Sequence, residues 1–285
     1  MSKSNKIFKF LFIAPVVIYS LILIFLPLLY ILFLSFCETD SYGGIIYHFT
    51  LENYLTILNI TYINIFLKSC LIGLITTIIC IAISYPFALI LRERSKKIQN
   101  LMTKLVMVPF LTNSLIRTYG WIVLLRKSGI INSTLLSLDL IEKPLNLMYN
   151  SLGIIIGMSY TLLPFMILPV CSSVFKINNS LIEAARDLGA SPIKIFKNII
   201  IPETLSGVFN GSLMVFIPAI GYFFISDLLG GGKVMIIGNL IKNQFLTARN
   251  WPFGSAIAIF LIIVTFILVK IYSKLGGKLD DLGGM

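Results

Sequence analysis

Long apolar runs alternate with short polar segments along this chain. Each run is about as long as the 20 apolar residues that a helix needs to cross the roughly 30 Å hydrocarbon layer of a bilayer. The alternating pattern of a membrane β-barrel is absent, and several runs are too long for strands. We therefore predict six transmembrane helices, at about 10–36, 63–91, 101–125, 152–175, 205–225 and 253–272.

The composition supports a membrane protein. Hydrophobic residues make up 57% of the 285 residues and charged residues only 12%, whereas a soluble domain is about 25% charged. Too little charge is present to cover a water-facing surface. We expect an all-α polytopic membrane protein whose residues 1–285 form a single transmembrane domain.

The first apolar run raises the alternative of a cleaved signal peptide. Lys3, Lys6 and Lys9 precede it, as in a basic leader. The run is longer than the apolar region of a typical signal peptide, and no small-x-small cleavage site closes it. We interpret it as a retained first span.

Basic residues are unevenly divided between the predicted loops. Lys and Arg outnumber Asp and Glu by 23 to 12, a formal net charge of +11. In the predicted topology, 15 of the 23 fall on one side: in the N-terminal tail, after the second and fourth spans, and at the C-terminal end. Lys and Arg near span ends concentrate on the cytoplasmic side. We therefore predict cytoplasmic termini and a cytoplasmic loop after the fourth span.

Most catalytic chemistry is excluded by the residues present. The four cysteines lie in or beside predicted spans without CxxC spacing, so a metal or redox site is not expected. The one histidine, His48, reads as a surface residue. The segment Gly230–Lys233 resembles a phosphate loop, but Asp227 and Val234 stand where that motif needs Gly and Ser or Thr. We expect no nucleotide site and no bound cofactor in this chain.

The segment 183–202, EAARDLGASPIKIFKNIIIP, is unusually punctuated for a connecting loop. Ser180 and Glu183 have the spacing of a capping box, which predicts a short helix. Leu181, Ala184, Ala185 and Leu188 would share its apolar face. Gly189 stands where a left-handed residue ends a helix.

A second short helix is predicted directly after the glycine. Ser191 and Pro192 fit its N-cap and first position, and it would run to about Ile200 before Pro202 turns the chain toward the fifth span. Lys194, Lys197 and Asn198 would face water, and Ile193, Phe196 and Ile200 an apolar surface.

Two interpretations of this helix pair compete. The pair could lie on lipid headgroups, which the two lysines would favour. The first helix fits that interpretation poorly, because an apolar face that is half alanine anchors weakly in lipid but allows another protein to approach closely. The pattern alone favours docking without naming a partner.

The same segment resembles the signature loop of ABC importer permeases, E-A-A-x-x-x-G-x9-I-x-L-P. Glu183, Ala184, Ala185, Gly189, Ile199 and Pro202 are in register, and Ile201 replaces the leucine. The segments 108–121, 160–170, 180–191 and 225–254 are similar to the B-type permeases of spermidine/putrescine importers. The likeness covers most of the chain from the first span onward.

The resemblance implies a protein of the bacterial plasma membrane that works together with other subunits. Such a permease pairs with a second permease to form the pathway, a cytoplasmic ATPase dimer uses ATP, and an external solute-binding protein delivers the substrate. The segment 176–204 would be the coupling loop, moved by closure of the ATPase. The positions that match the motif would then dock on the ATPase, and these are Glu183, Ala184, Ala185 and Gly189. Arg186 and Asp187 could form charge pairs across the same contact.

A polyamine pathway needs carboxylates for ammonium groups and aromatic faces along the methylenes. Polar residues inside spans are energetically costly and usually face a cavity. Candidates are Asn113 and Trp121 in the third span, Tyr160 in the fourth and Tyr222 in the fifth. Each aromatic residue could instead serve packing or an interfacial belt.

Three charged residues complete the candidates. Arg117 shares a helical stripe with Asn113 and Trp121 and would repel a polycation, so we expect it to pair within the protein or to gate. Asp227, one turn beyond Tyr222, is the acid best placed to meet a cation, although it could also act as a cap or contact the binding protein. Asp40 is a weaker candidate.

Mechanical features of the spans are less specific. Pro109, Pro164, Pro169 and Pro218 can kink helices, and Gly207 with Gly211 allows close helix packing.

A membrane-embedded enzyme is disfavoured because no His, Cys or carboxylate cluster lies within the spans. A stand-alone secondary transporter lacks a mid-span acid and an inverted repeat, and an ABC permease for another small solute remains as the alternative.

Overall fold

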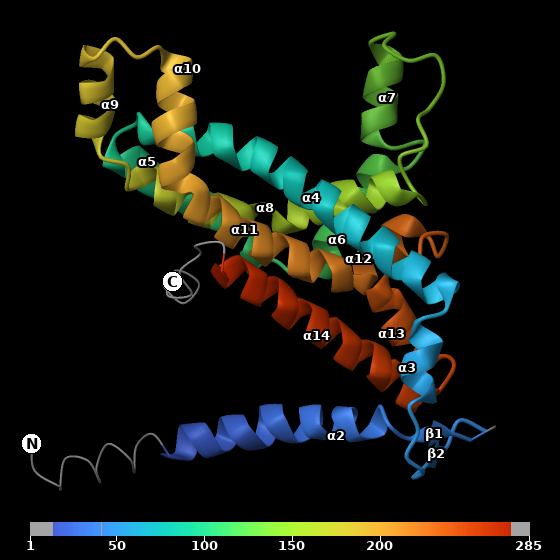
Figure 1. Cartoon of the computed structure of the whole chain (residues 1–285). Helices are drawn as coiled ribbons and strands as arrows, with labels where there is room; N and C mark the ends of the chain where they lie inside the picture. The colour runs from blue at the N-terminus through green and yellow to red at the C-terminus, as the bar shows by residue number, and fades with distance from the viewer. Residues whose placement is uncertain (1–13, 41, 275–285) are drawn as a thin grey trace, which may run out of the picture. The chain divides into compact units, whose positions relative to one another are not determined.

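The structure is a computed structural model that describes residues 14–40 and 42–274. Helices dominate the described chain (Figure 1). Five of them, at 14–34, 60–92, 151–175, 192–221 and 251–271, are long and apolar enough to cross a membrane. Contacts divide the chain into two compact units, one built from the described parts of 1–63 and 240–264, the other from 64–239 and 265–285.

The first unit begins with the helix of the first apolar run. It includes a π-helical stretch, η1 (Leu21–Phe25), and α2 (Leu26–Leu34). No residue in the most apolar stretch of this helix is buried against the rest of the described chain, as expected of a helix that faces lipid or a partner. Residues 10–13 of the predicted span lie outside the described residues.

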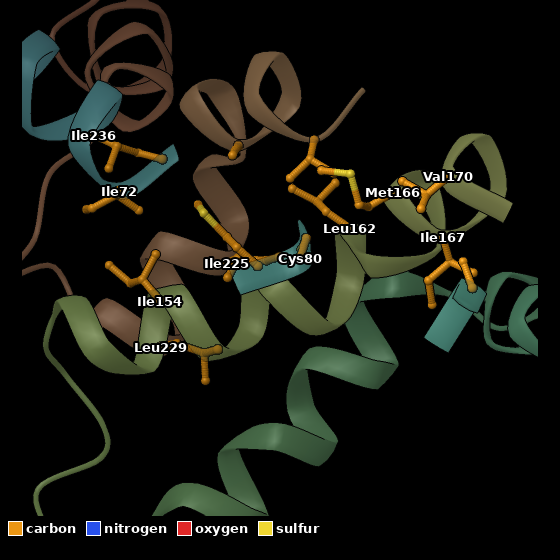
Figure 2. Close-up of a cluster of buried hydrophobic side chains, with 14 of the residues drawn as sticks. Ile72, Cys80, Ile154, Leu162, Met166, Ile167, Val170, Ile225, Leu229 and Ile236 are labelled. Carbon is orange, nitrogen blue, oxygen red and sulfur yellow. The ribbon is translucent and has the colours of Figure 1, made fainter. Parts of the chain in front are cut away.

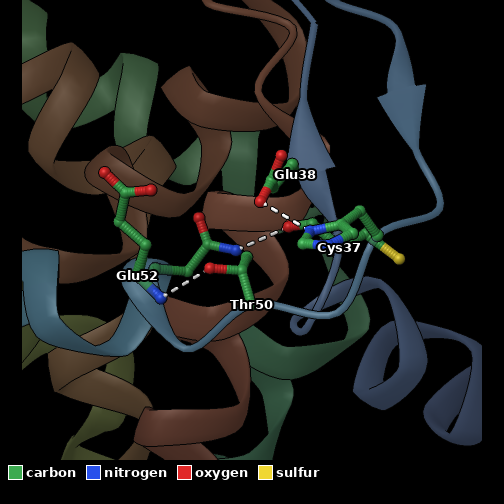
Figure 3. A network of polar contacts seen from close by, with 6 residues as sticks. Cys37, Glu38, Thr50 and Glu52 are labelled. Atoms are coloured by element: carbon green, nitrogen blue, oxygen red, sulfur yellow. Dashed lines mark hydrogen bonds and ion pairs between the residues drawn. The ribbon is translucent and has the colours of Figure 1, made fainter.

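A small polar assembly follows the first helix. Strands β1 (Glu38–Thr39) and β2 (Ile45–Ile46) pair antiparallel, with Glu38 opposite Ile46. The amide of Asn53, in α3 (Glu52–Ile57), donates 2.8 Å to the carbonyl of Cys37 and so joins α3 to the end of the first helix. His48 lies 2.9 Å from Glu38 and is largely exposed, in agreement with its interpretation as a surface residue. Figure 3 shows Cys37, Glu38, Thr50 and Glu52 of this assembly.

The rest of the first unit is the segment 240–264. It contains most of α13 (Ile237–Leu246) and the first part of α14 (Trp251–Lys274). The ring of Tyr62, in the first turn of α4, packs edge-on against Phe253 at a centroid distance of 5.0 Å. Thr39 donates a hydrogen bond of 2.6 Å to Asn250. These contacts close the unit between segments that are far apart in sequence.

The second unit contains most of the helices. They are α4 (Ile60–Arg92), α5 (Lys96–Met107), the 3-10 turn η2 (Val108–Leu111), α6 (Ser114–Leu125), α7 (Ile130–Ser137) and α8 (Ser151–Phe175), followed by α9 to α12. The core lies mainly between α8, α11 (Ile201–Gly221) and α12 (Phe223–Gly230). Leu162, Met166 and Val170 of α8 are fully buried there (Figure 2).

Two glycines set the distance between α8 and α11. A side chain at Gly207 would collide with Ser173 and lie 2.5 Å from the carbonyl oxygen of Pro169, and one at Gly211 would lie 2.5 Å from the sulfur of Met166. The absence of a Cβ lets the helix backbones approach closely. The close packing predicted for this glycine pair is confirmed.

The third predicted span is not one continuous helix. Residues 101–125 divide into α5, η2 and α6, with the break at 108–113. Pro109 lacks the N–H that a helix interior requires, and the side chain of Asn113 accepts 2.8 Å from the N–H of Leu115, which starts a new helix. Hydrophobicity alone could not reveal this break.

The fifth span also differs from its prediction. Its helix already begins at Pro192 and ends at Gly221, whereas 205–225 was expected. Tyr222 leaves helical geometry, with φ −76° and ψ 66°, and separates α11 from α12. Pro164 and Pro169 remain inside α8, and Pro218 inside α11.

Candidate functional site

The predicted coupling loop is a helical hairpin at one end of α8 and α11 (Figure 1). Its first helix, α9 (Asn179–Asp187), begins one residue before Ser180. The side chain of Asn178 is the cap and accepts 3.0 Å from the N–H of Ser180. The predicted capping box at Ser180 and Glu183 is therefore wrong, because the asparagine two positions earlier satisfies the first free N–H group.

The end of α9 matches its prediction. Gly189 has φ +74°, and the N–H groups of Gly189 and Ala190 donate to the carbonyls of Arg186 and Ala185, both at 2.9 Å. This is the hydrogen-bond pattern of a Schellman motif, which needs a left-handed residue. No atom lies within 4 Å of a Cβ built at Gly189, so backbone conformation rather than space requires the glycine.

The second helix of the hairpin does not stop before the membrane span. Ser191 precedes Pro192 at the start of α10 (Pro192–Ile195), as predicted, although its side chain makes no capping hydrogen bond. A π-helical stretch, η3 (Phe196–Ile200), then leads directly into α11. The expected turn at Pro202 is wrong, because the wide turns of η3 just before the proline accommodate its missing N–H within a continuous helix.

Three isoleucines hold the hairpin together. Ile177, Ile182 and Ile195 form a separate buried cluster, with Ala185 and Ala190 packed against it. Ile195, which is 5% exposed, takes the inward position expected for Ile193, which is 79% exposed. Helix α9 thus turns Ile182 toward α10, and the described residues leave Ile193 without comparable apolar cover.

The sequence-predicted docking residues lie on the outside of the hairpin. Glu183, Ala184, Arg186, Asp187 and Gly189 are exposed, and Ala185 is half-buried. Beside them Leu188 is 88% exposed. The side chains of Leu181, Ala184 and Leu188 on the predicted apolar face are therefore not covered by other described residues. Lys194, Lys197 and Asn198 are exposed, as predicted.

Two contacts that the sequence did not predict tie the hairpin to α4. Arg92, at the end of α4, donates to the carbonyl of Ile177 at 3.2 Å and to the side chain of Asn179 at 2.5 Å. Further along, the hydroxyls of Tyr85 and Thr204 lie 2.7 Å apart. These contacts attach the hairpin and the start of α11 to α4.

Two of the candidate pathway residues lie together. The rings of Trp121, in α6, and Tyr160, in α8, meet edge-on at a centroid distance of 5.3 Å. The guanidinium carbon of Arg117 lies 5.9 Å from the Tyr160 centroid and 5.4 Å from that of Phe110. This cluster of Phe110, Arg117, Trp121 and Tyr160, the aromatic–arginine cluster, joins the broken third run to α8.

Other candidates have local structural roles. Asn113 is the N-cap of α6. Its side-chain oxygen accepts from the N–H of Leu115, and its carbonyl accepts from the N–H of Arg117 at 3.2 Å, so the i, i+4 spacing of the predicted stripe begins at the cap. Tyr222 sits at the break between α11 and α12, with its ring 4.8 Å from that of Phe224. Phe110 escaped the sequence analysis because a phenylalanine in an apolar run carries no distinguishing signal.

Asp227 lies in α12 and accepts a hydrogen bond of 2.6 Å from the amide of Asn239. The same amide donates to the carbonyl of Phe223, and its oxygen accepts from Ile236. Asp40 belongs to the first unit, where its backbone closes the β1–β2 turn with Gly43 and Gly44. Among residues 14–40 and 42–274, no group of three or more His, Cys, Asp or Glu could hold a metal ion.

Comparison with known proteins identifies this arrangement. The chain aligns over 95% of its length, at a TM-score of 0.76 and 16% identity, with a bacterial ABC transporter involved in alginate import, covering 96% of that chain. A chain of the methionine transporter MetNI aligns at a TM-score of 0.56. The chain thus shares the fold of these two transporter chains.

Sequence relatives define the family more closely. The chain is 43% identical to the spermidine/putrescine transport system permease protein PotB of Salmonella typhimurium, over 98% of this chain and 99% of the relative. The chain is also 44% identical to PotB of Escherichia coli K12, over 91% of this chain and 94% of the relative. No protein-family model matches. The chain belongs to the PotB family of permeases, multi-pass proteins of the bacterial inner membrane.

Proposed function

We propose that this chain is the B-type permease subunit of an ATP-driven importer for spermidine and putrescine. The observation that carries the proposal is the near full-length identity of 43% to PotB of Salmonella typhimurium, whose name specifies that substrate class. The chain would form the translocation pathway together with a second, different permease. It binds no cofactor itself, and the partner ATPase uses the ATP.

The hairpin of α9 and α10 is the coupling element in this proposal. Its motif residues are exposed, and the open apolar side chains of Leu188 and Ile193 fit a protein partner better than water. The small side chains at 184 and 185 permit close approach. Glu183, Ala184, Ala185, Arg186, Asp187 and Gly189 would contact the ATPase.

The proposed orientation places both termini and the hairpin in the cytoplasm. The uneven distribution of lysine and arginine supports it. An external solute-binding protein would then meet the opposite side of the membrane. A complex of this kind has been solved for the bacterial alginate transporter, with an alginate pentasaccharide-bound periplasmic protein.

Uptake by the reconstituted system tests this function. Proteoliposomes containing this chain, its cognate second permease and the ATPase should accumulate radiolabelled spermidine only when ATP and the binding protein are supplied. Omission of this chain should abolish uptake. ATP-driven uptake of a different solute, with none of spermidine or putrescine, would contradict the substrate but leave the importer assignment in place.

A further inference from the structure

Arg117 is a partly buried cation of the second unit, and two of its three guanidinium nitrogens have no hydrogen-bond partner among the described residues. Its Nε and Nη1 atoms are buried and make no hydrogen bond with any residue that the structure describes. Burying a charge without a partner is strongly unfavourable. The alternative that Arg117 pairs within the protein, which the sequence left open, is therefore not realised among the described residues.

The environment of the guanidinium is aromatic. Its carbon lies within 6 Å of the ring centroids of both Phe110 and Tyr160, the range in which a cation is attracted by the ring face. Phe165 packs edge-on against Phe110, with a centroid distance of 4.9 Å, and Trp121 against Tyr160. These edge-on neighbours fix the two rings that contact the cation.

The same rings would attract the substrate. A polyamine carries several ammonium groups on a flexible chain, and aromatic faces bind ammonium groups through the same attraction that holds a guanidinium. A substrate ammonium and the Arg117 guanidinium therefore compete for one place, and two cations without a counter-charge repel each other in a region of low dielectric.

We propose that Arg117 is a resident cation that occupies the ammonium-binding face of Tyr160 and so gates the polyamine path. In the resting transporter the guanidinium fills this face and lowers the affinity of the pathway for free polyamine. Import requires the guanidinium to leave the ring, which releases the face to the substrate. This inference rests on the proposed polyamine function and adds a specificity-determining residue to it.

Equilibrium binding of radiolabelled spermidine tests the gate. The nucleotide-free transporter, assembled with its partners in lipid nanodiscs and without the solute-binding protein, is compared with Arg117→Gln and Arg117→Lys. Removing the charge should raise spermidine affinity about tenfold, whereas lysine, which keeps the charge, should stay close to wild type. Adding Tyr160→Leu to Arg117→Gln should remove the gain, because the ring face is lost.

Matched controls separate this effect from a general change of charge. Arg126→Gln removes an exposed arginine at the C-terminal end of the same helix and should leave spermidine affinity unchanged. Tyr160→Phe keeps the ring, so Arg117→Gln combined with Tyr160→Phe should retain the gain in affinity that Tyr160→Leu removes. If Arg117→Gln is poorly stable, Arg117→Met repeats the measurement with an uncharged side chain of similar length.

Three results would overturn the proposal. Unchanged or weaker spermidine binding in an assembled Arg117→Gln transporter would show that the guanidinium does not compete with substrate. Failure of both uncharged variants to assemble would indicate that Arg117 pairs with an acidic group of another subunit. A wild-type transporter that imports no polyamine would refute the proposed function itself, and the gate with it, whereas the first two results leave that function intact.

Discussion

The amide of Asn239 donates a hydrogen bond of 2.6 Å to the carboxylate of Asp227, and so joins the start of α13 to α12. Asn239 is only 4% exposed, and its amide group also bonds to Phe223 and Ile236. Gly231 and Gly232 lie between the two helices, directly after Gly230, the last residue of α12. Asp227 thus has a structural role beside any role toward a cationic substrate.

Two substitutions at Asp227 separate these roles. Asp227→Asn removes the charge but keeps an acceptor oxygen, whereas Asp227→Ala leaves an amide hydrogen of Asn239 without this partner. A lost buried hydrogen bond costs about 1–3 kcal/mol. We expect Asp227→Ala to lower the thermal stability of the purified transporter, and Asp227→Asn to keep stability while weakening spermidine uptake.

Uptake kinetics and thermal unfolding, measured on the same preparations, check this pair. Normal uptake by a stable Asp227→Asn transporter would remove the carboxylate from the pathway and leave only the structural role. Equal stability of the alanine variant and wild type would instead contradict the importance of the bond to Asn239.

Gly189 provides a test of the coupling hairpin. A residue with a Cβ in left-handed geometry costs about 1–2 kcal/mol, and β-branched residues are the least tolerated there. Gly189→Val should therefore distort the end of α9, lower ATPase co-purification and abolish transport, while membrane insertion stays normal. Asparagine tolerates this geometry, so Gly189→Asn is the matched variant and should retain most activity.

Co-purification of the ATPase with the permease measures the outcome. Because a Cβ built at Gly189 meets no described atom within 4 Å beyond its chain neighbours, we attribute a loss in the valine variant to the left-handed backbone geometry. Full association and uptake with valine would mean that the geometry of this bend does not control docking.

The apolar pattern predicted most of the spans, because a helix that crosses the bilayer needs about 20 consecutive apolar residues. The runs at 63–91 and 152–175 match α4 and α8 within a few residues. The run at 101–125 failed, since its break depends on Pro109 and on a cap by Asn113 within an otherwise apolar stretch. Hydropathy averages over such local chemistry.

The coupling hairpin was predicted in outline from the sequence but not in its packing. Gly189 could be placed because left-handed geometry has a strong residue preference. The cap could not be placed reliably, since Asn178 and Ser180 are both good caps two positions apart. Whether Ile193 or Ile195 points inward depends on the position of Ile182 in space, which no local pattern specifies.

The pathway candidates were limited for a different reason. Trp121 and Tyr160 were selected separately as aromatic residues in spans, and their edge-on contact joins helices 39 positions apart in sequence. Phe110 gave no signal at all. Such a cluster is a property of tertiary packing, and whether its members contact substrate remains a prediction.

Leu188 and Ile182 separate docking from folding within α9. Leu188 is 88% exposed and Ile182 9% exposed, so their substitutions should act on different properties. Leu188→Asp should leave the thermal stability of the permease unchanged and weaken ATPase association. Ile182→Ala should lower stability by about 2–5 kcal/mol, as expected for truncation of a buried isoleucine.

The readouts are thermal unfolding of the purified permease and pull-down of the ATPase. If Leu188→Asp leaves association unaffected, the exposed face of α9 is not the docking surface. In that case Ile193→Asp, on the other exposed part of the hairpin, would show whether α10 makes the contact instead.

Gly207 tests whether α8 and α11 must pack closely. In Gly207→Ala the new methyl group would meet the side chain of Ser173 and the carbonyl of Pro169, and the carbonyl belongs to backbone that cannot rotate away. Overpacking of this kind costs about 1–3 kcal/mol. Thermal unfolding should therefore shift to lower temperature, and only partly recover when Ser173→Gly is added. Gly120→Ala is the matched control, because no atom lies within 4 Å of its Cβ position and alanine favours a helix. Equal stability of Gly207→Ala and Gly120→Ala would contradict a close-packed contact between α8 and α11, the helices that flank the coupling hairpin.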